Sequence, residues 1–221
     1  MGDGVVDARV RRTHARLRAA IVELVTDKGY QAVTIEHLCE RAEVTRATFY
    51  THFRDKEHLL ASVADELIDR CLDAFADRSG GLADLRGERL VVLFEEARHD
   101  DAHAALRIIL RGEGDGAALR HLRQRLVAIV GETLVEHGAL LRATPVVPLT
   151  VLIEMLVGEI VAVLGWWIEQ EEPAPDARRV VEWLRASSLY GRLWALGIGD
   201  DVLSNDRAAA YRAGLPPREG T

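Results

Sequence analysis

The segment from Thr34 to Leu60 limits most strongly what this chain can fold into, because its apolar residues predict two short helices joined by a tight turn and then a third helix. The first helix has one apolar stripe at the spacing i, i+3, i+4 and i+7, formed by Ile35, Leu38, Cys39 and Ala42. Thr34 is its predicted N-cap. These features predict a helix-turn-helix unit.

The second short helix has an apolar side and a side rich in hydrogen-bond donors. Thr45 is its predicted N-cap, and Phe49 and Phe53, four residues apart, are predicted to face inward. The residues predicted to face outward are Arg46, Thr48, Tyr50, Thr51 and His52. None of them carries a carboxylate, and the next acidic residue along the chain is Asp55. Such a face can donate to phosphates and base edges without repelling them, so it favours DNA binding.

Residues 9 to 60, about a quarter of the chain, resemble the DNA-binding domain of the tetracycline-repressor (TetR) family of bacterial transcriptional regulators. The matching positions are Gly29-Tyr30, Thr34-Ile35, Leu38, Ala42, Val44-Thr45, Thr48-Phe49-Tyr50, His52-Phe53, Lys56-Glu57 and Leu59-Leu60. One position departs from the pattern, since Glu43 stands where the family often has Gly. A left-handed backbone at a non-Gly residue costs about 1 kcal/mol, so a slightly strained turn is expected there.

The resemblance implies which side chains contact DNA. Arg46, Ala47 and Tyr50 are the expected base contacts, since a guanidinium can pair with guanine and the other two can contact a thymine methyl group. The expected phosphate contacts are Thr34, Thr45, Thr48, Thr51, His52 and Lys56. Two alternatives stay open: the Tyr50 ring packs partly on the first short helix, and His52 is a hydrogen-bonded structural imidazole.

The resemblance also implies a homodimer that responds to a small molecule. In the family the last two long helices pair with the same two of a second subunit in a four-helix bundle. Two recognition helices related by a two-fold axis can occupy major grooves about 34 Å apart, so a palindromic operator on double-stranded DNA is expected. An unidentified small-molecule effector is expected to bind the C-terminal part and to oppose operator binding.

The predicted fold class is all-α: an N-terminal three-helix helix-turn-helix DNA-binding domain (1–55), then a C-terminal helical ligand-binding and dimerisation domain (56–197) and a disordered tail (198–221). Helices are predicted at 7–28, from Lys56 onward, and at 87–98, 101–111, 116–137, 145–171 and 176–196. Turn signals lie at 79–81, 112–116 and Gly138.

Charge is distributed unevenly along the chain. The net charge is −7, yet residues 1–60 hold 10 Lys and Arg against 9 Asp and Glu, so the acidic excess lies in the remainder. An arginine cluster near the start is either a set of DNA-backbone contacts or a solvated helix end: Arg9, Arg11, Arg12, Arg16 and Arg18. A weakly acidic protein is thus compatible with a DNA-binding head.

The segment 145–171 is nearly apolar, so a membrane span is one interpretation. Glu154 and Glu159 lie in its middle and would each cost a few kcal/mol in lipid, which favours a buried helix of a soluble assembly. No secretory signal is recognisable in the first residues, and two cysteines are too few for a disulfide framework. A cytoplasmic protein without cofactor is therefore expected.

Other residues have weaker functional interpretations. His99, His103 and Arg107 recur every four residues, a spacing that suits a metal or an anion, although a solvated polar face is favoured. Trp166, Trp167 and Met155 either line a ligand cavity or belong to the core or the dimer interface. Cys39 lies in an apolar stripe, which favours an inert thiol over a redox switch.

Three classes of function follow. The favoured one is a ligand-responsive transcriptional regulator, most often a repressor. The alternative is a helical ligand-binding or protein-interaction module with the same fold and no transcriptional role. An enzyme is disfavoured because the sequence has no Ser/His/Asp or Cys/His arrangement and no phosphate-binding Gly-rich loop.

Overall fold

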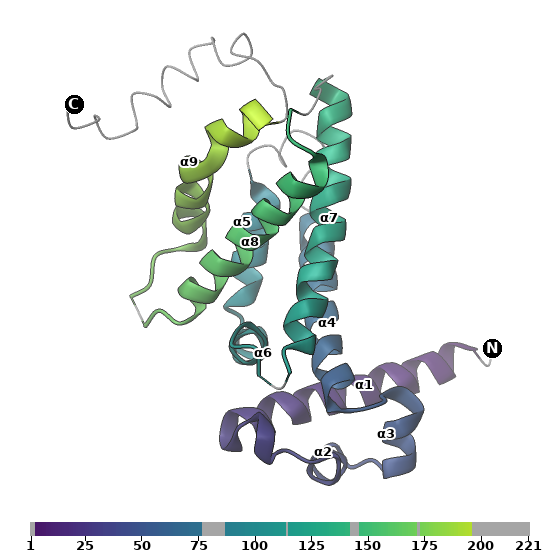
Figure 1. The fold of residues 1–221 in the computed structure, drawn as a ribbon. Helices are drawn as coiled ribbons and strands as arrows, with labels where there is room; N and C mark the ends of the chain where they lie inside the picture. The colour runs from purple at the N-terminus through teal and green to yellow at the C-terminus, as the bar shows by residue number, and fades with distance from the viewer. Residues whose placement is uncertain (1–2, 77–86, 114, 142–145, 172, 196–221) are drawn as a thin grey trace.

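The computed structural model describes residues 3–76, 87–113, 115–141, 146–171 and 173–195, and over these ranges it is entirely helical (Figure 1). The helices are α1 (Asp3–Lys28), the 3-10 turn η1 (Tyr30–Ala32), α2 (Ile35–Ala42), α3 (Arg46–His52), α4 (Lys56–Ala76), α5 (Glu88–Ala97), α6 (Asp100–Leu110), α7 (Ala117–Leu141), α8 (Leu149–Ile168) and α9 (Ala177–Ala195). The predicted all-α class is confirmed. The predicted turn at 79–81 and the predicted disordered tail lie outside the described residues.

The N-terminal head consists of α1, α2 and α3 together with the first turns of α4. α1 packs against α2 and α4, and its buried residues Leu17 and Ile21 belong to the same core as Leu38 of α2 and Phe49 of α3. The apolar spacing of each helix thus forms a closed core, and α2 and α3 lie beneath α1 at one end of the molecule (Figure 1).

Helix α4 belongs to both parts of the molecule. Leu59 and Leu60, at its start, are buried, and further along it packs against α5 and α7. The remaining helices, α5 to α9, form the body: α7 packs against α4 and α8, and α9 lies against α5 and α8. In Figure 1, α4 rises from the head into the body.

Most predicted helix ends are close to the observed ones, with one error. Gly112 and Gly116 both have positive φ, 68° and 74°, and separate α6 from α7 as expected. Gly138 was predicted to end a helix, but α7 continues through it to Leu141. A single Gly costs only about 1 kcal/mol in a helix, which the packing of a 25-residue helix can offset.

α8 is the one described helix that is long and apolar enough to span a membrane, and 39% of its most apolar window is buried in the structure. Its N-terminal half packs on α7, where Glu154 Oε2 lies 3.4 Å from Arg123 Nη2. One such helix is weak support for a membrane span, because core helices of soluble proteins have the same composition.

Candidate nucleic-acid interface

Thr34 fixes the start of α2 and keeps one donor available. Its Oγ1 accepts a hydrogen bond from the His37 backbone N–H at 3.2 Å, and the Thr34 N–H donates to His37 Nδ1 at 3.2 Å. This reciprocal pair is a capping box. The hydroxyl proton of the exposed Thr34 has no part in the cap, so it can still donate to a phosphate.

The turn between α2 and α3 contains the left-handed residue that the sequence predicts. Glu43 has φ 50° and ψ 48°, and it is the one non-glycine residue with positive φ in the described part of the chain. Its carboxylate forms an ion pair with Arg16 of α1. The contact ties the strained turn to α1, although both side chains are well exposed and such pairs contribute at most about 1 kcal/mol.

α3 has the predicted buried and exposed sides. Phe49 and Phe53 are buried, with ring centroids 6.0 Å apart, whereas Arg46, Ala47 and Tyr50 are exposed. The Tyr50 ring is 51% exposed and touches Phe49 edge-on with its centroid 5.5 Å away. Among the described residues, the Arg46 guanidinium has no hydrogen-bond or ion-pair partner. The three side chains expected to read bases therefore share one accessible face.

The hydroxyl groups of α3 already take part in local hydrogen bonds. Thr45 Oγ1 accepts from the Thr48 N–H at 3.1 Å and lies 2.9 Å from Thr48 Oγ1. Whichever hydroxyl donates in that pair, the other retains its proton for a phosphate. Thr51 Oγ1 donates to the Ala47 carbonyl at 2.9 Å, so it must rotate before it can donate to DNA.

His52 has a structural contact that sequence alone does not reveal. Its half-buried ring meets the His14 ring of α1 edge-on at 4.9 Å, and His14 in turn lies 4.9 Å from the Phe53 ring. Burial, followed by the neighbouring His52, Arg18 and His58, lowers the pKa of His14. His52 therefore helps to pack α3 on α1 through a ring contact, and its role in phosphate binding stays a prediction.

Lys56 points inward, contrary to the expectation of a free phosphate ligand. Its Nζ donates to the carbonyls of Tyr30 at 3.0 Å and Val33 at 3.1 Å and lies 4.1 Å from the centre of the Tyr30 ring. The Tyr30 hydroxyl donates to Glu57 Oε1 at 2.5 Å. The ammonium thus holds the start of α4 to η1, where it supplements the bond that the Tyr30 carbonyl accepts from the Val33 N–H. Only one of its three N–H groups remains for DNA.

The arginine cluster of α1 divides into two groups. Arg9 and Arg12 are exposed, whereas Arg16 pairs with Glu43 and Arg18 Nε lies 2.5 Å from Glu66 Oε2 of α4. The two arginines closer to the N-terminus thus remain as possible backbone contacts, and the other two hold α1 to its neighbours.

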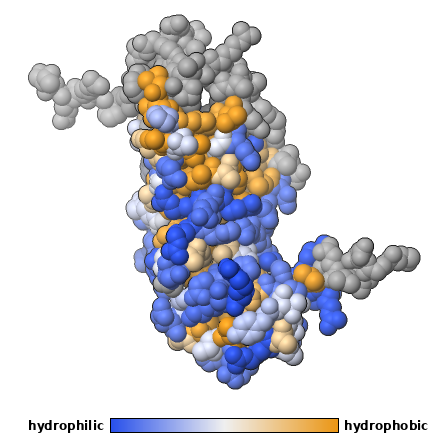
Figure 2. Space-filling model, turned by 45° about the vertical axis from the view of Figure 1, so that its right-hand side comes forward, coloured by the Kyte–Doolittle hydropathy of each residue, from blue (hydrophilic) through white to orange (hydrophobic). Residues whose placement is uncertain are grey.

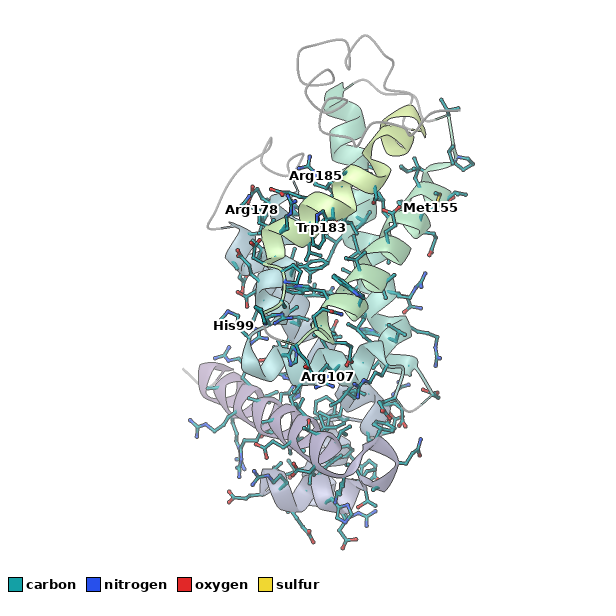
Figure 3. The ribbon with its side chains drawn as sticks, turned by 90° about the vertical axis from the view of Figure 1, so that its left-hand side faces the viewer. His99, Arg107, Met155, Arg178, Trp183 and Arg185 are labelled. Carbon is teal, nitrogen blue, oxygen red and sulfur yellow. The ribbon has the colours of Figure 1, made fainter. Side chains whose placement is uncertain are left out.

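The residues His99, His103 and Arg107 do not form a single site. His99 is the N-cap residue of α6 and is exposed, whereas His103 Nε2 lies 2.9 Å from the Ile168 carbonyl and Arg107 Nη2 lies 3.2 Å from Glu169 Oε2. Figure 3 shows His99 and Arg107 well separated. The favoured interpretation as a solvated face is therefore wrong for His103, which the last carbonyl of α8 attracts, whereas Arg107 stays partly exposed and pairs with the Glu169 carboxylate.

The cysteine thiols are buried, as predicted for Cys39. Burial raises the pKa of Cys39, and it raises that of Cys71 to about 12, so neither is a reactive thiolate. In the described ranges, no three His, Cys, Asp or Glu side chains gather as a metal site would require.

A second surface, on α8 and α9, is apolar and exposed. Along α8 the exposed residues Val151, Met155, Ala162 and Trp166 are separated by 4, 7 and 4 positions, so they form one stripe. On α9, Trp183 is 45% exposed. Met155 and Trp183 project from these two helices in Figure 3, and Figure 2 shows apolar residues gathered on the body while the head is mainly hydrophilic. Trp167 is instead buried against Phe94, with ring centroids 5.2 Å apart.

The helix-turn-helix segment matches a known family. The sequence model of bacterial regulatory proteins of the tetR family matches residues 17–63, which include α2, α3 and the residues that pack them on α1 and α4. Over this segment the chain is similar to the TetR family. The family consists of DNA-binding regulators that are not enzymes, in agreement with the sequence-based expectation.

Individual TetR-family relatives agree with this placement. The chain is 33% identical over 134 residues to the transcriptional regulator AcuR of Cereibacter sphaeroides, covering 58% of this chain and 59% of AcuR. It is 35% identical over 69 residues to the transcriptional repressor KstR of Mycolicibacterium smegmatis, covering 31% of this chain and 33% of KstR. The chain thus spans less than two thirds of the length of either relative.

The fold of a solved TetR-family structure extends over the body as well. A TetR-family transcriptional regulator from Syntrophomonas wolfei superposes with a TM-score of 0.66, at 18% identity, over 86% of this chain and 97% of that one. At this identity the similarity concerns the fold alone.

Proposed function

We propose that this protein is a homodimeric transcriptional repressor that inserts α3 into the major groove of a palindromic operator. The exposed face of α3 carries the proposal, because Arg46, Ala47 and Tyr50 point away from the core and the guanidinium has no internal partner among the described residues. A free, planar set of donors is what bidentate recognition of guanine requires.

The phosphate contacts are proposed in a revised form. Thr34 retains its hydroxyl proton, and so does one of Thr45 and Thr48, so these residues are the favoured donors to phosphate. Thr51 contributes only after its hydroxyl group rotates. His52 and Lys56 contribute only through the hydrogen-bond donors that their internal contacts leave free. Arg9 and Arg12 on α1 supplement them.

The dimer is proposed to form through the apolar surface of α8 and α9. Exposed apolar residues in a stripe are costly in water and mark protein contacts. A second copy of the same pair of helices covers the stripe in a two-fold arrangement, which presents two α3 helices to one operator. A cytoplasmic location and release of DNA by a small-molecule effector complete the proposal.

The central experiment selects bound fragments from genomic DNA and then measures affinity for the enriched site as a function of salt. A regulator enriches a near-palindromic sequence, and its affinity falls steeply with salt on a log-log plot while exceeding that for random DNA. Equal affinity for all sequences would instead favour the helical interaction module without transcriptional role.

Arg46→Ala tests the base contact directly. We expect it to reduce discrimination between the operator and a variant at one base pair by about 1–3 kcal/mol per half-site. Arg120→Ala is the matched control, because it removes the same charge from an exposed position of α7 in the body. If both variants discriminate as the wild type does, Arg46 does not read a base.

A further inference from the structure

A cavity of about 330 Å³ lies between α1, α4 and α6, where the head meets the body. α1 packs against both other helices, and α4 also packs against α6. The space exists because small side chains occupy the facing positions, among them Ala15 and Ala19 of α1 and Ala102 and Ala105 of α6. Three crossing helices with alanines at the crossing leave room that larger side chains would fill.

The wall of the cavity is largely apolar. It includes Val22 of α1, Val63 and Leu67 of α4, and Leu106 and Ile109 of α6, four of them buried in the core. Such a wall suits a hydrocarbon group, because the main gain from filling it is the removal of apolar surface from water.

Four charged residues line the cavity, and one of them has no charged partner. Arg18 pairs with Glu66, although its N–H does not point well at the carboxylate, and Glu23 pairs with Arg41. Among the described residues, Arg70 forms no hydrogen bond or ion pair, and its Nε is buried without an acceptor. Glu66, four residues earlier on α4, is the usual partner for such a position but contacts α1 instead.

We propose that this cavity binds a small monocarboxylate with a hydrocarbon body, the carboxylate pairing with Arg70. A buried guanidinium N–H without an acceptor lowers stability, so an anion that supplies one binds with a gain. Of the two arginines and two glutamates in the lining, Arg18, Glu23 and Glu66 already have charged partners. One added negative charge therefore matches Arg70, the single cation of the lining without such a partner. A doubly charged phosphate would meet the two glutamates, whereas a planar carboxylate matches the fork of Arg70.

A ligand at this place contacts the head through α1 and the body through α6 at once. Its binding therefore changes how firmly the two are held together, and it is coupled to any function that depends on the position of the head. Only this coupling rests on the proposed function, because ligand binding itself is measured without DNA.

The test uses octanoate as the probe and octan-1-ol as its uncharged match, with calorimetry and thermal shift on the full chain. The wild type is expected to bind octanoate at least about tenfold more tightly than the alcohol. Arg70→Gln should reduce octanoate binding to the level of the alcohol, Arg70→Lys should restore part of it, and Arg120→Gln, the exposed control, should leave it unchanged.

Ala105→Leu fills the cavity and should abolish binding of both probes while helical circular dichroism stays at the wild-type level. The proposal is overturned if octanoate does not bind, if it binds no better than octanol, or if Arg70→Gln and Ala105→Leu bind it as the wild type does, which would place it elsewhere.

The coupling is tested separately on the enriched operator. Octanoate should change operator affinity in the wild type and not in Arg70→Gln. Octanoate binding by a protein that binds no operator would refute the proposed function and leave the cavity assignment intact. Operator binding without octanoate binding would refute the cavity assignment and leave the proposed function intact.

Discussion

The head and the α8–α9 surface of the body differ in what they leave exposed. In the head, Phe49 and Phe53 are buried and the exposed residues of α3 are mostly polar. On α8, by contrast, Val151, Met155 and Trp166 are 46%, 59% and 48% exposed. The head therefore completes its own core and offers donors to a polyanion, whereas the body keeps apolar area that another protein surface can cover.

The largest effect is expected from opening the core of the head. Phe49→Ala removes a fully buried ring and should destabilise the head by about 3–5 kcal/mol. Hydrogen exchange should become faster in residues 30–60 while the body stays protected. Tyr50→Ala, next to it but half exposed, is the control and should change stability by less than about 1 kcal/mol. Equal losses in both variants would contradict the division of α3 into a buried and an exposed side.

Met155→Glu tests the apolar surface of the body. Two carboxylates facing a two-fold interface should weaken the dimer by about 2–4 kcal/mol without loss of helix, and operator affinity should fall with it. Sedimentation velocity measures the oligomeric state. Gln124→Glu, which adds the same charge at an exposed polar position of α7, should remain dimeric. A Met155→Glu protein that sediments as the wild type does would exclude this stripe from the interface.

Glu43 provides a smaller test of the head, at its strained turn. Glu43→Gly and Glu43→Ala both lose the ion pair with Arg16, but only glycine adopts φ 50° without strain. The glycine variant should therefore be more stable than the alanine variant by about 1 kcal/mol in urea unfolding. Identical midpoints would show that the left-handed backbone carries no strain.

The smallest expected effect is a pH dependence of head stability. Because burial lowers the pKa of His14 below 6.5, the unfolded chain binds a proton more readily than the folded one. This contribution to stability is complete above pH 6.5 and is lost as the pH falls towards the folded-state pKa. Unfolding of wild type and His14→Gln between pH 7.5 and about 5 measures it. The variant should show the shallower dependence, and parallel curves would contradict the assignment.

Local features of the head were predictable from sequence. The caps at Thr34 and Thr45 depend on residues three positions away, and the burial of Phe49 and Phe53 follows from their spacing. The left-handed turn at Glu43 was predicted from a family pattern in which glycine is common.

Contacts between distant segments were not predictable in this way. Lys56 donates to a carbonyl 26 residues earlier, Arg18 pairs with Glu66, and His103 contacts the end of α8, 65 residues later. Each of these residues is of a polar type that usually faces solvent. Only the way in which the helices cross in the folded structure shows which partner it contacts. The cavity at Arg70 has the same origin, because it depends on alanines of three separate helices.

Helix α4 is a long, continuous helix that connects the head to the body. Its 21 residues correspond to a rod of about 31 Å, with the head clasped at Lys56 and the other end embedded among α5 and α7. Pivoting such a rod by ten degrees carries its tip through about 5 Å, the rise of a helical turn. A small repacking in the body is thereby amplified at the head, so in the proposed dimer the fit of the two heads to a duplex would be sensitive to events far from either one.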